Sequence, residues 1–122
     1  MYTTNKIESL LREDEVGLAL LIVSVRVENE LYTRVRNHFG LSKEDYEDLK
    51  LGSKGLGWHV AKACENDLVK SEYRNSLDNL AKKRSSLVHD DGYLETMEGV
   101  HSSRKEIKQL VFEVIEFLEE SE

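Results

Sequence analysis

Apolar residues recur every three or four positions along most of this chain, and charged residues fill many of the positions between them. This period is typical of amphipathic α-helices. The longest stripe predicts a helix over about 14–39 and consists of Leu20, Val23, Val27, Leu31, Val35 and Phe39. Because proline, the strongest breaker of helices, is absent from the sequence, the pattern favours an all-α fold.

The first half of this long helix is apolar on nearly every side. Four large apolar residues lie off the main stripe, namely Leu18, Leu21, Ile22 and Val25. A helix that is apolar all round has to be covered all round. The pattern therefore predicts either a central place in the fold or a face that is buried in a dimer.

Shorter segments flank the long helix. A first helix is predicted over about 4–13, where apolar residues gather on one side. After the long helix, Gly40 is suited to end it and Ser42 to begin a short helix or turn. The glycine-rich segment 51–57, LGSKGLG, predicts a loop in which glycines adopt positive φ angles.

Three further helices are predicted in the second half of the chain. They cover about 55–68, Ser71 to near Val88, and about 103–120. Ser103 and Glu106 have the spacing of a capping box at the start of the last one, and an irregular stretch over about 90–101 precedes it. Four main helices with short connections, plus the short N-terminal helix, predict one domain over 1–122, folded as an up-and-down bundle.

The helix that begins at Ser71 has an arginine in its apolar seam. The seam residues are spaced 4, 3, 4 and 3 apart and are Tyr73, Leu77, Leu80, Arg84 and Leu87. Burying a guanidinium group without a partner costs several kcal/mol. An anionic group is therefore expected to meet Arg84.

His89 follows Arg84 by five residues and is expected at the end of the same helix. Five residues at about 100° each leave two positions about 140° apart on a regular helix. Two arrangements would bring the residues together: His89 swings toward Arg84 where the chain turns near Gly92, or two such helices pair across a dimer axis. A purely structural alternative bonds Arg84 to a helix C-terminus or to Asp78 and Asp90.

The charge of the chain limits its partners. A formal net charge of −7 excludes the all-over basic surface of a constitutive DNA-binding protein. Nucleic acid could still meet a local basic patch, such as residues 82–84 or the pair Arg34 and Arg36. The segment RVRNH, residues 34–38, is interpreted as a solvated face of the long helix.

Few other chemistries fit the sequence. Cys64 is the only cysteine and is expected to be a small buried hydrophobe, so no intrachain disulfide and no cysteine-based zinc site can form. The histidines lack metal-ligand spacing, and neither a metal nor another cofactor is expected. The longest apolar run, 16–23, is too short to cross a bilayer and no signal peptide is evident, which predicts a cytoplasmic protein without a membrane partner.

The motif RSSLVH, residues 84–89, together with the segment before it, resembles a known family. An Arg-x4-His motif at the end of a bundle helix is similar to the signature of the HEPN superfamily of small helical domains. A glycine-lysine turn, two helices and an Arg-x4-His-Asp ending also resemble the mannitol operon repressor family. The resemblance covers roughly residues 50–95.

The resemblance to HEPN domains implies metal-independent cleavage of RNA by a homodimer, as in toxins and phage-defence effectors with an antitoxin partner. It implies that Arg84 holds the scissile phosphate and that His89 moves the proton of the 2′-hydroxyl. Lys82, Lys83 and Ser85 would then line the substrate cleft, and Lys54 is expected to face it. The resemblance to the mannitol repressor family implies the alternative, a non-catalytic regulatory module that acts through protein partners.

Overall fold

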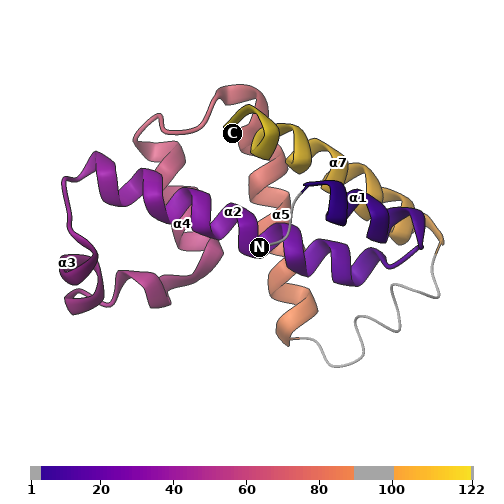
Figure 1. The fold of residues 1–122 in the computed structure, drawn as a ribbon, viewed down its shortest axis with the longest axis horizontal. Helices are drawn as coiled ribbons and strands as arrows, with labels where there is room; N and C mark the ends of the chain where they lie inside the picture. The colour runs from indigo at the N-terminus through magenta and orange to yellow at the C-terminus, as the bar shows by residue number, and fades with distance from the viewer. Residues whose placement is uncertain (1–3, 90–100, 122) are drawn as a thin grey trace.

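Helices are the only regular elements in the part of the chain that the structure describes (Figure 1). The structure is a computed structural model; it describes residues 4–89 and 101–121, and for 86–89 and 101–104 it describes the backbone alone. The predicted all-α class is confirmed. No described helix combines the length and the apolar character that a membrane crossing requires.

Most of the predicted helix bounds agree with the observed ones within three residues. In chain order the elements are α1 (Thr4–Arg12), α2 (Val16–His38), α3 (Lys43–Asp48), the 3₁₀ helix η1 (Leu51–Lys54), α4 (Gly55–Glu65), α5 (Ser71–His89) and α7 (His101–Ser121). The prediction of a loop over 51–57 is wrong, because η1 and the start of α4 cover these residues, but the positive φ predicted for its glycines is found at Gly55. Gly55, at a φ of 84°, lets η1 lead directly into α4, because a glycine adopts this backbone conformation without strain.

Helix α2 lies at the centre of the molecule. It packs against α1, α4, α5 and α7. The stripe from Leu20 to Val35 is buried along its length, as are Ala19 and Ile22 outside the stripe. Of the two places predicted for this helix, the structure shows the central one, since four helices cover most of its circumference.

Three large apolar residues on or beside α2 remain uncovered. Leu18 is 46% exposed and Val25 is 48% exposed, so one strip of the helix faces outward. The prediction that Phe39 continues the buried stripe is wrong, and this ring is 49% exposed. The helix ends at His38, and Phe39 is its C-cap residue, which takes the ring out of the helical register.

The turn after α2 follows the predicted chemistry. Gly40 adopts a φ of 66°, and the N–H of Leu41 donates back to the carbonyl of Arg36 at 3.0 Å. Ser42 then caps α3: its hydroxyl accepts from the N–H of Asp45, whose carboxylate accepts from the N–H of Ser42, both at 3.0 Å.

The second half of the chain places α5 across the centre. Helix α7 packs along α2, and α1 lies against both of them. Helix α5 also contacts α2, α4 and α7, and in Figure 1 it crosses behind α2 and continues well beyond it. The C-terminal end of α5, which ends at His89, lies beyond this crossing.

Candidate functional site

Arg84 continues the buried seam of α5, as predicted. Leu77 and Leu80 of this seam are fully buried, and Arg84 follows Leu80 by one helical turn. The Arg84 side chain is half-buried, and its Nε atom is buried without a hydrogen-bond partner among the described residues. This is an unsatisfied cationic donor at the edge of the core, where each such group carries a cost.

The acids proposed as structural partners of Arg84 are engaged elsewhere or lie outside the described residues. Asp78 pairs with Lys82, with 3.0 Å between Oδ2 and Nζ. Asp90 lies outside the residues that the structure describes, as do Asp91 and Gly92. Within the described chain, therefore, no carboxylate neutralises Arg84.

His89 is the last residue of α5, and its side chain lies outside the description. The helix is continuous from Arg84 to this end, so the five-residue spacing on a regular helix holds for the backbone. Lys82 and Ser85 are exposed beside Arg84, and Lys83 is half-buried. Lys54 belongs to another part of the molecule, because it ends η1, which packs against α3 and α4.

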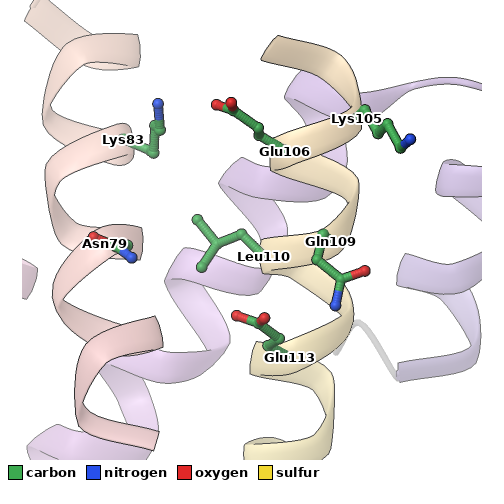
Figure 2. A pocket seen from close by; sticks show the side chains of 7 residues that line it. All are labelled: Asn79, Lys83, Lys105, Glu106, Gln109, Leu110 and Glu113. Atoms are coloured by element: carbon green, nitrogen blue, oxygen red, sulfur yellow. The ribbon is translucent and has the colours of Figure 1, made fainter. Parts of the chain in front are cut away.

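A cleft of about 650 Å³ opens between α5 and α7 beside this site (Figure 2). It is lined by Asn79 and Lys83 of α5 and by Lys105, Glu106, Gln109, Leu110 and Glu113 of α7. In Figure 2, Lys83 and Glu106 extend toward each other across the gap, yet no ion pair joins them in the described structure. Among the described residues, the lining holds two positive and two negative side chains, so their formal charges cancel.

Along the same two helices lies an acidic hollow of about 350 Å³. Its lining includes Glu72 of α5 and Glu113 and Glu116 of α7. Glu113 borders both the hollow and the cleft, and it is held in place because the Ser76 hydroxyl donates to its Oε2 at 2.9 Å. The α5–α7 surface thus changes from balanced charge at the cleft to negative charge at the hollow.

The side chain of Arg34 was expected on a solvated face of the long helix, but it is bound to other parts of the protein. It donates from Nε to Glu30 at 2.9 Å and from a terminal nitrogen to the carbonyl of Leu68 at 2.8 Å. A second terminal nitrogen donates to the Ser121 hydroxyl at 2.5 Å, and the guanidinium lies 4.8 Å from the centre of the Phe117 ring. The prediction is wrong for Arg34, because Leu68 and Ser121 come from distant parts of the chain, whereas His38 of the same segment is exposed as predicted.

A second set of contacts near Arg34 joins the end of α7 to the rest of the molecule. Glu120 accepts hydrogen bonds from the ammonium group of Lys70 and from the hydroxyl of Tyr73. The ring of Tyr73 packs edge-on against Phe117, with 5.6 Å between ring centroids. These contacts fasten the end of α7 to the start of α5 and to the loop before it.

A buried polar pair joins α3 to α4, and sequence reasoning missed it. Tyr46 and His59 are both fully buried. The Nδ1–H of His59 donates to the carbonyl of Gly55 at 2.7 Å, because a carbonyl can only accept, and Nε2 then accepts from the Tyr46 hydroxyl at 2.5 Å. Burial, with a smaller contribution from Tyr32, raises the pKa of Tyr46 above its ordinary value.

Other reactive groups in the described part of the chain do not assemble into a metal site. Across the residues that the structure describes, no three histidine, cysteine or acidic side chains gather in a way that could hold a metal ion. Cys64 is half-buried, and burial raises the pKa of its thiol. Since the thiolate is the nucleophilic form, this raised pKa makes Cys64 a poor nucleophile at neutral pH.

Comparison of the chain with protein-family models, with curated proteins and with solved structures gives no match.

Proposed function

We propose that the chain is a metal-independent endoribonuclease of the HEPN type, a toxin or phage-defence effector that cleaves RNA as a homodimer. The proposal includes an HEPN-like up-and-down arrangement of the four long helices. It also includes action in the cytoplasm without a cofactor. The residues that perform the reaction are Arg84 and His89.

The observation that carries the proposal is that Arg84 forms no internal hydrogen bond or ion pair in the described part of the chain. Its Nε is buried without a partner among the described residues, at a seam position where an apolar side chain would cost less. An anion that arrives from outside would supply the missing acceptor. A phosphodiester fits this need, because arginine binds phosphate through charge-assisted hydrogen bonds and often through two at once.

The reaction needs only groups that the chain and the RNA contain. The 2′-hydroxyl loses its proton to one His89, and its oxygen attacks the adjacent phosphorus. The bond from phosphorus to the 5′ oxygen breaks, and that oxygen takes a proton from a second His89. Arg84 stabilises the negative charge that builds on the phosphoryl oxygens. The products are a 2′,3′-cyclic phosphate and a 5′-hydroxyl.

Two copies of the chain suit this chemistry better than one. On a regular helix, positions five residues apart lie about 140° from each other. One copy of α5 therefore presents Arg84 and His89 to different directions, whereas two copies paired near the ends of α5 could combine both motifs in one site. A dimer would also supply the separate base and acid that the two proton transfers require.

The test is RNA cleavage in EDTA by wild type, Arg84→Ala and His89→Ala. Each variant is expected to lose at least about 100-fold in rate, because His89→Ala removes the general acid and base and Arg84→Ala removes the group that stabilises the developing charge. His38→Ala is the matched control, because His38 is an exposed histidine on α2 and should leave the rate unchanged. Product ends are analysed for cyclic phosphate, and circular dichroism checks the fold. Wild-type rates from both folded variants would overturn the assignment.

The acidic hollow favours a second candidate, a non-catalytic regulatory module. Glu72, Glu113 and Glu116 would repel RNA along this surface and would attract a basic protein partner, such as an antitoxin or regulator. The cleavage assay separates the two candidates. A folded, dimeric wild type that leaves RNA intact would support the module, whereas cleavage that depends on His89 would support the nuclease.

A further inference from the structure

We infer that the cleft between α5 and α7 is a base-binding subsite that takes guanine, with the edge of the base against Glu106. This inference rests on the proposed function, because it places the base beside the phosphate that Arg84 is proposed to hold. Lys83, which lines the cleft, directly precedes Arg84 in α5. The two positions are about 1.5 Å apart along the helix axis and about 100° apart around it, so a nucleotide that meets both residues has to wrap around the side of α5.

Size and charge suit a base better than a stretch of phosphate backbone. A volume of about 650 Å³ lies within the range of small-molecule sites. Two lysines and two glutamates line it, so the cleft offers no net attraction to a polyanion. A neutral, polar, planar group meets no net charge penalty there. The side chain of Leu110 provides an apolar surface against which the face of the ring can pack.

The polar groups of the cleft are available to a ligand. Within the described chain, the side chains of Asn79, Lys83, Glu106 and Gln109 form no hydrogen bond or ion pair with the protein. Lys83 and Glu106 extend toward each other from opposite walls without an ion pair between them (Figure 2). A molecule that presents donors on one side and a negative group on the other would bridge this gap.

Guanine offers the donor pattern that a carboxylate prefers. Its N1–H and N2–H groups lie side by side on one edge, and the two oxygens of Glu106 can accept both of them. Uracil has two carbonyl oxygens around a single N–H on the same edge, and these oxygens would face the carboxylate unfavourably. Adenine and cytosine each present one amino group beside a ring-nitrogen acceptor. The phosphate of the same nucleotide would meet Lys83.

Binding of the four nucleoside 3′-monophosphates to the full chain tests this subsite without any need for cleavage. Titration followed by NMR or calorimetry is expected to rank guanosine 3′-monophosphate first. Glu106→Gln should weaken its binding by about tenfold or more, because a two-bond contact to a base edge discriminates to that extent. The uridine nucleotide should bind with unchanged, weak affinity. Glu119→Gln, an exposed position on the same helix, is the matched control and should match wild type.

The outcomes distinguish this inference from the proposed nuclease activity. Equal affinity for all four nucleotides, no binding at all, or wild-type affinity in folded Glu106→Gln would each overturn the guanine subsite, even if the chain cleaves RNA. Guanine-selective binding that Glu106→Gln removes would establish the subsite, even if His89→Ala shows that the cleavage assignment is wrong.

Discussion

Two arginines of this molecule, Arg34 on α2 and Arg84 on α5, differ in what their guanidinium groups bind. Arg34 donates to Glu30, to the carbonyl of Leu68 and to Ser121, and it also lies over the Phe117 ring. Arg84 has a buried Nε with no partner in the described chain. An arginine whose donors are satisfied internally serves the architecture. An arginine whose N–H groups have no internal partner is the better candidate for binding a ligand.

Arg36 lies between these two extremes. Its Nε is also buried without a partner in the described chain, but its terminal nitrogen donates to the carbonyl of Leu41 at 3.3 Å. That bond helps to close the turn after α2. A buried Nε without a hydrogen-bond partner is therefore not enough to identify a ligand site. Arg84 differs from Arg36 because no internal hydrogen bond or ion pair to any of its nitrogens is found among the described residues.

The largest expected effect on stability comes from Arg34→Ala. The change removes several hydrogen bonds of a charged group and its contact with Phe117, which together stabilise the fold by about 3 kcal/mol. Thermal unfolding should begin roughly 10 °C lower. Arg12→Ala removes the same charge from an exposed site at the end of α1 and should leave the melting temperature nearly unchanged. If both variants melt alike, the Arg34 contacts contribute nothing beyond charge.

A smaller effect is expected at high pH from Tyr46, a neutral group that is satisfied internally. Because its folded pKa is raised, the folded state keeps the proton that the unfolded chain releases above about pH 10. Its contribution is therefore fully present below that pH and is lost as the pH rises, by up to about 1.4 kcal/mol per pH unit.

Tyr46→Phe isolates this contribution. The variant loses the bond to His59 and should be less stable at pH 7, but its unfolding free energy should fall less steeply between pH 10 and 11 than that of wild type. Urea unfolding at several pH values measures both slopes. Parallel curves would show that ionisation of Tyr46 is not linked to folding.

The smallest effect on stability is expected from Arg84→Leu, and this variant should be more stable than wild type. Replacing an unpartnered guanidinium at a seam position with an apolar side chain should raise the unfolding free energy by about 1 kcal/mol while abolishing any cleavage. Arg12→Leu controls for the change in net charge. A folded Arg84→Leu protein with clearly lower stability would mean that Arg84 has a structural partner after all.

The long helices could be predicted because their apolar residues recur with a regular period. The burial of a short helix and the contacts between distant parts of the chain could not. Helix α3 has six residues and one buried side chain, Tyr46, so no period exists from which to predict its burial. The spacing of Glu30 and Arg34 could have indicated an ion pair. It could not indicate Leu68 or Ser121, which are 34 and 87 positions away from Arg34.

The position of the candidate site along the chain could be predicted, but the side chains that surround it could not. The seam spacing placed Arg84 at the edge of the core, where the structure also has it. Asp78 pairs with Lys82 and not with Arg84, because positions four apart face each other on a helix whereas positions six apart do not. Glu106 was interpreted only as a capping residue, since its place opposite Lys83 depends on how α5 and α7 pack.

The separation of 87 positions between Arg34 and Ser121 has a consequence for biosynthesis. A ribosome that adds about 5–20 residues per second needs roughly 4 to 17 s to make the chain between them. During that time the apolar surface of α2 that α7 will cover is already made, while the helix that covers it is still absent. The nascent chain must therefore pass through a stage in which its central helix is partly bare, and the cell's chaperones would meet this protein at that stage.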